Sequence, residues 1–309
     1  MPKLQGDVKN ERQSFTSPSL QFLAIGHVTR DLHPNNSFSL GGTVTFAALT
    51  AYHLGLVAGI VTCAALDVIQ ELPQYLPNIA YFARPSAETT TFVNQYQQGF
   101  RTQYLRAKAD ALMSTDIPLL WCDTPIVLIG PLAQEISPEI VALFRRRPGA
   151  LIAATPQGWL RSWDADGRVW PTPWETVEQI LPLLDVLILS HDDLLPFAND
   201  NRHEADAMLR AWSMRVPLLV ATDGRHGATL FQHGATEYFS AYDAQEVDPT
   251  GAGDVFAAAF LTSLYRHGDA EQAVDFANCV ASFSVEHEGV LGIPTAEMVA
   301  VRLEKCKKR

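Results

Sequence analysis

The sequence has few cysteines and no long uninterrupted apolar run. Its four cysteines are scattered along 309 residues, without a C-x-x-C pair or the histidine-rich spacing of a metal site, so we expect free thiols in a reducing cytosol. No apolar run reaches the roughly 18 to 20 residues that a membrane helix needs. Residues 1–19 are polar and lack the apolar segment of a signal peptide. These absences predict a cytoplasmic protein with no membrane segment and with a flexible tail at residues 1–19.

A surplus of basic residues is also missing. The chain has 23 lysines and arginines against 34 aspartates and glutamates, which gives a formal net charge of −11. This balance argues against nucleic acid or an anionic membrane as the main partner, although a local pocket can still be positive enough for a small anion. With 47% hydrophobic and 18% charged residues, the chain can bury a sizeable core in one large or two modest domains.

Strand and helix patterns alternate from residue 125 onward. Apolar runs predict strands, and the segments between them predict helices, so the chain should form a mostly parallel sheet covered by helices on both faces, an α/β fold. The expected strands are residues 126–130, 151–154, 186–190 and 218–222, and the expected helices are residues 137–146, 176–181, 192–197 and 204–212. Residues 89–106 break this rhythm and predict a hairpin with a turn at residues 97–100. Four of the six tryptophans fall in residues 159–174, where we expect them to pack.

The most informative stretch is residues 248–254, which read D-P-T-G-A-G-D and open directly into an apolar helix. A turn of small residues at a helix start leaves N–H groups unpaired, and Gly251, Ala252 and Gly253 let a phosphate approach that backbone. Asp254 would repel such an anion unless its charge has a task, such as accepting the proton of an attacking hydroxyl. We therefore predict that Asp254 is a general base beside an anion hole; a simple first-turn aspartate is the alternative.

This seven-residue motif and the small-residue helix after it resemble the signature of the ribokinase-like (PfkB-type) carbohydrate kinase family. The resemblance spans roughly residues 20–298. It implies a three-layer α/β/α domain at residues 20–300, with a small β lid around residues 89–106 and a C-terminal tail at residues 301–309. It also implies ATP- and Mg²⁺-dependent phosphorylation of a hydroxyl group on a sugar, cyclitol or nucleoside. Residues 39–42, 85–90 and 247–250 look most like the inositol kinase branch.

Residues that would contact the acceptor come from the first third of the chain. The glycine pair Gly41 and Gly42 leads into a predicted helix and resembles the family's N-terminal glycine pair, which lies under the phosphate acceptor. Asp31 follows the first predicted strand, residues 21–26, where a carboxylate can bind substrate hydroxyls or can simply be a solvated turn residue. Asn94 and Arg106 are candidate contacts from the lid, and an edge hairpin with polar faces would explain them equally well.

Residues on the nucleotide side follow from the same resemblance. Residues 222–227 fit the family's T-x-G-x-x-G, which lines the nucleotide phosphates, although a plain hairpin with a surface arginine would also fit. The helix predicted at residues 273–286 and the loop after it border the adenine. Family members often bind a monovalent cation near the position of Asp248, and such a cation remains open here. The implied nucleotide contacts are Thr222, Gly224, Arg225, Gly227, Thr250, Asn278 and Gly289.

Some family patterns are altered. Ser190 and Asp193 stand where the family has N-x-x-E, which acts on the magnesium and phosphate surroundings. Asp193 is therefore a candidate Mg²⁺ ligand through water, and a helix N-cap is an equal alternative. The family's G-x-D-x-x-G is absent after residues 59–65, where only Asp67 remains.

Two functions stay open. The first is a kinase for a small-molecule acceptor, working as a monomer or as a homodimer through the lid. The second is a catalytically silent sugar- or nucleotide-binding protein of the same fold, which the altered residues 190–193 would suit. A dinucleotide-dependent oxidoreductase would need G-x-G-x-x-G after the first strand, and residues 26–31 do not supply it.

Overall fold

A computed structural model of the chain describes residues 19–33, 37–97, 100–145 and 149–307. Most of the predicted N-terminal tail and the tip of the predicted hairpin, residues 98–99, lie outside this range. None of the described helices combines the length and the apolar character that crossing a membrane requires.

A nine-stranded sheet forms the centre of the described part of the chain, in the order β15-β14-β13-β12-β9-β8-β1-β4-β5. The strands from β13 to β5 in this order run parallel, whereas β14 and β15 are added antiparallel at one edge. The expected strands therefore formed nearly as predicted. Their bounds are Phe22–Ile25 (β1), Ala58–Ala64 (β4), Ala80–Pro85 (β5), Ile126–Ile129 (β8), Leu151–Ala154 (β9), Val186–Ser190 (β12), Leu218–Thr222 (β13), Ala228–Gln232 (β14) and Ala235–Phe239 (β15).

The inner strands are apolar on both faces because helices cover the sheet on both sides. In β1, Phe22 and Ala24 pack into one core cluster while Leu23 and Ile25 pack into the other, and all four are fully buried. This alternation follows from the two-residue period of a strand. A continuous apolar run is thus the sequence signature of a central strand rather than of an edge strand.

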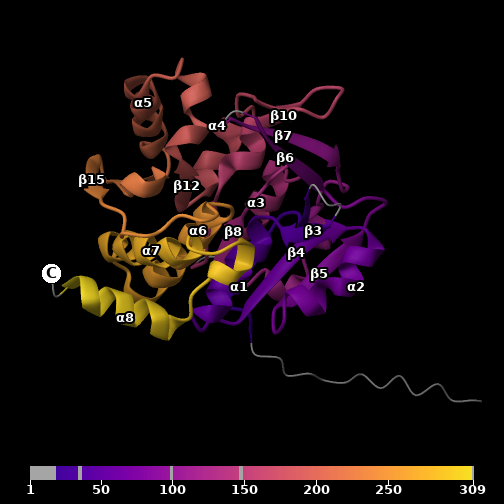
Figure 1. The fold of residues 1–309 in the computed structure, drawn as a ribbon, viewed down its shortest axis with the longest axis horizontal. Helices are drawn as coiled ribbons and strands as arrows, with labels where there is room; N and C mark the ends of the chain where they lie inside the picture. The colour runs from indigo at the N-terminus through magenta and orange to yellow at the C-terminus, as the bar shows by residue number, and fades with distance from the viewer. Residues whose placement is uncertain (1–18, 34–36, 98–99, 146–148, 308–309) are drawn as a thin grey trace, which may run out of the picture.

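The helices form the two outer layers of the sandwich (Figure 1). One cluster contains residues of α1 (Thr43–His53), α2 (Leu66–Tyr75), α6 (Ala252–His267), α7 (Ala270–Ser284) and α8 (Ala296–Lys307). The opposite cluster contains residues of α3 (Pro138–Arg145), α4 (Val177–Ile180) and α5 (Arg202–Ser213). Residues 301–307, which the sequence analysis assigns to a tail, continue α8, and Val299 anchors that helix in the core.

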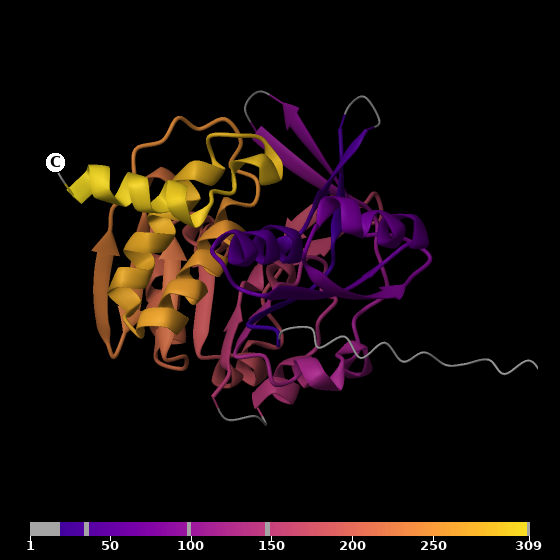
Figure 2. The same cartoon turned by 90° about the horizontal axis from the view of Figure 1, so that it is seen from below.

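A second sheet of four strands, here called the lid sheet, projects from the body (Figure 2). It contains β2 (Thr29–Leu32), β3 (Phe38–Gly41), β6 (Thr91–Gln97) and β7 (Phe100–Ala107), in the order β3-β2-β6-β7. The hairpin predicted at residues 89–106 is the β6–β7 pair. The sequence analysis missed β2 and β3, so Asp31 lies within a lid strand and not in a loop after the first strand.

A small hairpin of β10 (Arg161–Trp163) and β11 (Val169–Pro171) lies against the lid sheet, where Tyr104 of β7 forms a bridge with Arg168. The two residues that flank this hairpin in the sequence, Trp159 and Trp174, stack at a centroid distance of 4.9 Å, and both are buried. These two tryptophans pack as expected.

The helix predicted at residues 192–197 is replaced by two 3-10 turns, η5 (His191–Asp193) and η6 (Leu195–Phe197). Pro196 explains the difference, because proline lacks the N–H of a helix and disfavours helical geometry in the residue before it.

Candidate active site

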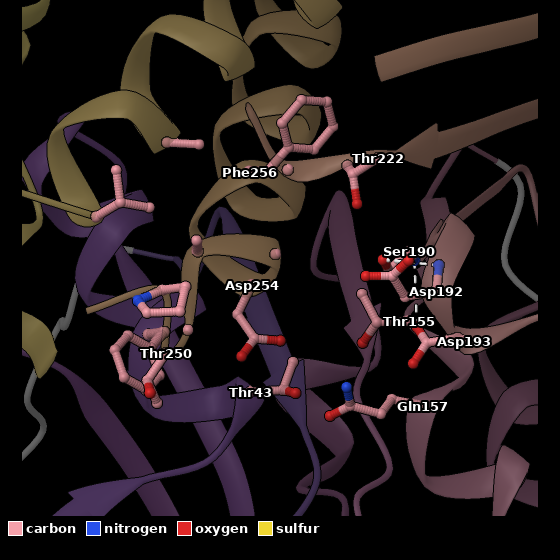
Figure 3. Close-up of a pocket in the computed structure, with 18 of the residues that line it drawn as sticks. Thr43, Thr155, Gln157, Ser190, Asp192, Asp193, Thr222, Thr250, Asp254 and Phe256 are labelled. Carbon is pink, nitrogen blue, oxygen red and sulfur yellow. Dashed lines mark hydrogen bonds between the residues drawn. The ribbon is translucent and has the colours of Figure 1, made fainter. Parts of the chain in front are cut away.

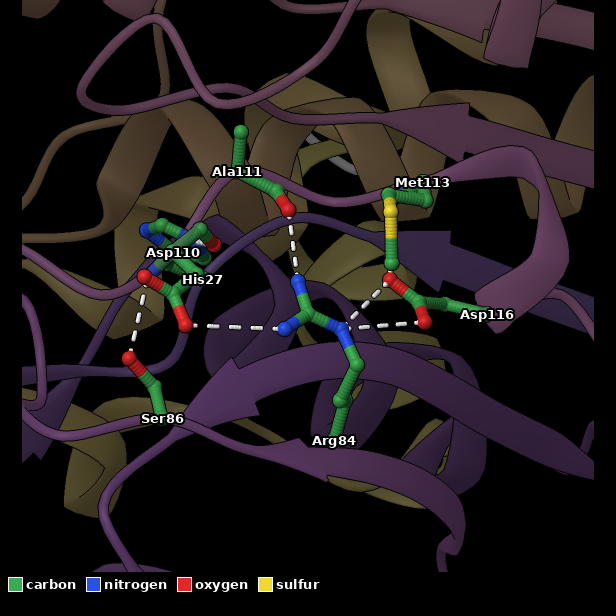
Figure 4. Close-up of polar contacts among 7 residues, drawn as sticks. All are labelled: His27, Arg84, Ser86, Asp110, Ala111, Met113 and Asp116. Carbon is green, nitrogen blue, oxygen red and sulfur yellow. Dashed lines mark hydrogen bonds and ion pairs between the residues drawn. The ribbon is translucent and has the colours of Figure 1, made fainter.

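A cavity of about 740 Å³ opens at the carboxyl ends of the parallel strands, where ligands bind in open α/β sheets. Thr155, Ser190 and Thr222, which stand at or just after the ends of β9, β12 and β13, line it together with the starts of α1 and α6. The lid sheet contributes Asp31 and Asn94. The fold therefore collects residues that are more than 200 positions apart in the sequence around one space (Figure 3).

The start of α6 forms a backbone cradle. Gly251 is the N-cap residue, has a left-handed backbone with φ of 78°, and a Cβ there would lie 2.4 Å from the Phe46 ring. The first intrahelical bond runs from Val255 N to Gly251 O, so the amides of Gly253 and Asp254 have no intrahelical acceptor. A Cβ on Gly253 would meet no atom within 4 Å. The cradle therefore faces open cavity, and glycine is needed at position 251 for the backbone and for packing.

Asp254 points into the cavity from the first turn of α6 (Figure 3). Burial raises the pKa of this carboxyl to about 6, while a hydrogen bond from Thr43 and the positive charge of Arg161 act in the opposite direction and the charge of Asp193 adds to the rise. A carboxylate with a pKa close to neutrality can accept a proton at physiological pH and release it again. Thr43 owes its place to Gly130, since a Cβ at that glycine would lie 2.3 Å from the Thr43 methyl.

Gly41 and Gly42 are required for different reasons. Gly42 has φ of 94°, and a Cβ there would lie 2.4 Å from the carbonyl oxygen of His27, so a side chain would both strain and clash. A Cβ on Gly41 would lie 2.2 Å from Asp31 Oδ2. The Asp31 carboxylate is therefore packed directly against the glycine pair, and Asp31 and Gly42 both line the cavity.

Two side-chain amides of the lid sheet, those of Asn94 and Gln103, line the cavity. Asn94 Oδ1 accepts a hydrogen bond of 3.1 Å from Gln103 Nε2, and both residues line the cavity. Arg106, the other expected lid contact, lies outside it. Its side chain is exposed, donates a hydrogen bond of 3.1 Å to the carbonyl of Asp166 and stacks over the Tyr104 ring.

The predicted nucleotide contacts gather on the other side of the cavity, with one exception. Thr222, Gly224, Arg225, Gly227, Thr250 and Asn278 all line it. The side-chain amide of Asn278 donates to the carbonyls of Phe239 and Ser240, at 3.4 and 3.3 Å, and so fixes the segment that follows β15. Gly289 is not among the lining residues; its N–H donates 3.0 Å to Asp248 Oδ2, whose other oxygen accepts from Thr250 N.

Residues 190–193 form a helix-type N-terminal cap, the alternative to a metal-binding role. Asp193 Oδ2 accepts from Ser190 N at 3.1 Å, and Ser190 Oγ accepts from Asp192 N at 3.2 Å. Burial raises the pKa of Asp193, against the nearby Arg161, the Ser190 N–H and a hydrogen bond from Gln157. Among the described residues, no three His, Cys, Asp or Glu side chains are grouped as a metal site. Mg²⁺ in phosphoryl-transfer sites needs only one or two protein carboxylates besides the phosphates, and Asp192 and Asp193 on the cavity wall fit that requirement.

Comparisons with known proteins agree with this geometry. Residues 163–296 match the model of the pfkB family carbohydrate kinases. A pyrophosphate-dependent kinase of the ribokinase family, solved with a pyrophosphate analogue and myo-inositol, superposes with a TM-score of 0.77 over 91% of this chain and 99% of that chain, at 23% identity. The chain thus has the fold of the ribokinase-family kinases, and its residues 163–296 are similar to the pfkB family. The match covers the cap, the T-x-G-x-x-G loop and the α6 cradle, whereas Asp31, the glycine pair and the lid sheet precede it.

Curated proteins similar to this chain include two fructokinases. The Escherichia coli fructokinase is 24% identical over 298 residues, covering 88% of this chain and 95% of the relative. The probable fructokinase-5 of Arabidopsis thaliana is 27% identical over 172 residues, or 52% of this chain. In that alignment the chain spans about half of the length of its relative, 53%.

The structure also places four residues in the cavity that the sequence analysis does not name as site residues: Thr43, Thr155, Gln157 and Arg161. Thr43 directly follows the glycine pair, so that position gave a usable signal. The other three lie in and beside the tryptophan-rich stretch, which was interpreted as packing alone. No spacing rule in the sequence links them to Asp254, because the contact depends on how β9 and α6 meet across the sheet.

Proposed function

We propose that the protein is an ATP-dependent kinase that phosphorylates a hydroxyl group of a sugar, a cyclitol or a nucleoside. The observation that carries this proposal is the position of Asp254 at the start of α6. Its carboxyl group has a pKa raised to about 6, and the backbone amides of Gly253 and Asp254 beside it have no intrahelical acceptor. A base and an anion cradle within one helical turn suit phosphoryl transfer, since the base must act next to the group being transferred.

Phosphoryl transfer in this site would involve one proton transfer, one bond formed to phosphorus and one bond broken. Asp254 takes the proton of the acceptor hydroxyl, and the hydroxyl oxygen forms a bond to the terminal phosphorus of ATP. The bond from that phosphorus to the bridging oxygen breaks, and ADP leaves with the electron pair. The open amides of Gly253 and Asp254 stabilise the charge on the transferring group. Mg²⁺, when bound, neutralises phosphate charge, and Asp193, through water, with Asp192 beside it would hold it.

The acceptor would lie between Asp254 and the lid sheet. Asp31 and Asn94 line that side of the cavity and offer oxygens for hydroxyl groups, while Gly42 lets the ring approach the backbone. Sugars and cyclitols also fit the relatives, which are named fructokinases, and the structural neighbour that holds myo-inositol. This supports a polyhydroxylated acceptor.

The donor would lie along α7. Beyond Thr222 and Gly224 the cavity continues to Ala281, Ser282 and Val285, a surface of small side chains against which an adenine could lie. This extension favours ATP over pyrophosphate, the donor named for the structural neighbour.

A panel of acceptors tests the proposal with both donors. Purified protein is incubated with sugars, cyclitols and nucleosides, with ATP or with pyrophosphate, and phosphorylated product is measured, with Asp254→Asn as the matched inactive control. Product with ATP supports the proposal. Product with pyrophosphate alone would overturn the donor, and binding of acceptor and ATP without product from any acceptor would favour the silent binding protein.

Two finer expectations can be tested in the same assay. A monovalent cation near Asp248 predicts that activity in potassium is lost when a bulky organic cation replaces it. A homodimer through the lid predicts a doubled mass in solution and loss of that mass when lid-edge residues are changed. Activity without any monovalent cation, or a monomer at all concentrations, would remove the respective expectation.

A further inference from the structure

Thr155 has a buried hydroxyl that calls for a ligand. The residue is 8% exposed and lines the cavity, and its Oγ1 makes no hydrogen bond to any described residue. An unpaired buried hydroxyl is costly and rare in folded proteins, so each instance needs an explanation. Thr155 directly follows β9, the strand next to β12, and lies between Asp254 and Asp193 in Figure 3. Its hydroxyl therefore lies between the proposed base, Asp254, and the part of the cavity where the phosphate donor would bind.

Arg161 brings positive charge to the same space. The described residues that line the cavity include six carboxylates but only two cationic side chains, Arg161 and Arg225. The charge of Arg161 acts on both Asp254 and Asp193, which lie on opposite sides of that space. It stands at the start of β10, one 3-10 turn after Thr155.

The lid sheet fixes the direction of this arginine. Arg161 Nη1 donates a hydrogen bond of 3.1 Å to Gln103 Oε1 of β7, and Gln103 Nε2 donates to Asn94 Oδ1 of β6. The Gln103 side chain therefore accepts from Arg161 with its oxygen and donates to Asn94 with its nitrogen, so it links the arginine to two strands of the lid sheet.

We propose that Thr155 and Arg161 bind the terminal phosphoryl group of the donor from the side opposite the α6 amides, with Gln103 as the positioning residue for Arg161. This inference rests on the proposed kinase function. Thr155, which follows β9, and Arg161 line the cavity together with the α6 cradle, so a hydroxyl and a guanidinium would add hydrogen-bond donors to those of the cradle amides. The arginine also offsets the carboxylates that would otherwise repel a phosphate.

Thr155→Val is the sharpest single test, because it removes only the hydroxyl and keeps the shape. The unpaired group disappears, so the melting temperature should stay equal or rise, whereas affinity for a non-hydrolysable ATP analogue should fall about fivefold. Unchanged analogue affinity would overturn the role of Thr155. A lower melting temperature together with unchanged affinity would instead show that the hydroxyl is structural, and would overturn it as well.

Arg161→Gln is tested against Arg168→Gln, which removes the same charge from the same hairpin at a residue that stacks on Trp170 outside the cavity. Arg161→Gln should weaken the ATP analogue about tenfold or more and ADP less than twofold, since ADP lacks the terminal group. Arg161→Lys should restore part of the affinity, and Gln103→Leu should reproduce part of the loss. Equal losses for the analogue and ADP, or equal effects of both arginine substitutions, would refute the assignment.

A titration of Asp254 gives a readout that does not need turnover. Asp254 faces Arg161, Asp193 and the Thr43 hydroxyl, so removing the arginine should move the Asp254 titration to higher pH in carboxyl NMR, and Arg168→Gln should leave it in place. If the wild type transfers phosphate but the variants bind and titrate like it, this inference alone fails. If no acceptor is phosphorylated while the analogue still discriminates the variants, the proposed kinase function fails and the phosphate contact stands.

Discussion

Replacing Asp254 with asparagine should remove catalysis and stabilise the fold at the same time. The substitution keeps the size of the side chain and an oxygen that can accept from Thr43, but it removes the basicity. The variant should bind ATP and the acceptor within a few-fold of the wild-type affinities. Its kcat should fall roughly 10² to 10⁴-fold, which is the usual contribution of a positioned general base. In the wild type, kcat/KM should fall as the pH drops through about 6, where Asp254 becomes protonated, and the variant should lose this dependence.

The stability gain follows from the raised pKa. In the unfolded chain the carboxyl ionises near 3.8, whereas in the folded chain it keeps its proton up to about pH 6. The folded state is therefore disfavoured progressively as the pH rises from about 4 to 6, and the cost stays constant above that range. The rise of about two pH units corresponds to about 3 kcal/mol, and loss of a favourable charge at a helix start subtracts up to about 1 kcal/mol. With some solvent access through the cavity, we expect a gain of about 1 to 2 kcal/mol at pH 8 and almost none at pH 4.

Chemical unfolding at pH 4 and pH 8, combined with single-turnover phosphoryl transfer and ATP affinity, tests both effects on the same two proteins. A first-turn aspartate without a catalytic role would give unchanged kcat and a small loss of stability. A variant that keeps more than about a tenth of the wild-type kcat would refute the general-base role. Equal stability of the two proteins at pH 8 would refute the explanation by burial.

Three further substitutions probe the cradle and the acceptor wall. Gly253→Val should lower kcat/KM at least about a hundredfold with a melting temperature close to wild type, because its side chain would enter open cavity where the phosphate approaches; near-normal turnover would contradict the anion hole. Gly251→Ala should lower the free energy of unfolding by about 2 to 4 kcal/mol, since it combines a left-handed backbone with a clash against Phe46, and denaturant unfolding measures this. Asp31→Ala should raise the KM of the acceptor far more than that of ATP, and equal effects on both would return Asp31 to a purely structural role.

Local sequence patterns were sufficient for the inner strands of the sheet and for the turn that opens α6, but not for the edge strands β5 and β15. β9, β12 and β13 begin and end at the predicted residues, because a strand buried on both faces must be a continuous apolar run. The lid sheet was only half predicted. β2 and β3 are four residues each, and β2 pairs with β6, which lies about sixty residues later, so no local turn signal announces that pairing.

The position of Arg106 and Arg161 shows the limit for single side chains. Both are arginines near the expected lid. The sequence analysis names only Arg106 as a contact, yet its side chain bonds to Asp166 and does not line the cavity. Arg161 lies in the tryptophan-rich stretch, for which the sequence predicts only packing. Its hydrogen bond to Gln103 of the lid sheet places its charge where it acts on Asp254. A strand residue can face either side of its sheet, and which side is the cavity depends on elements far away in the chain.

The sequence by itself determined the α/β fold, the α6 turn and Asp254 as its unusual carboxylate, because a glycine-rich turn, a helix start and a charge are all properties of neighbouring residues. Only the tertiary structure decided that Thr43, Thr155 and Arg161 line the same cavity as that carboxylate, that Asp31 packs against Gly41, and that burial raises the pKa of Asp254 to about 6. The physical reason is that solvent exclusion and charge interactions depend on distance in space, and the chain brings residues 31, 155 and 254 together only when the parallel strands align their carboxyl ends.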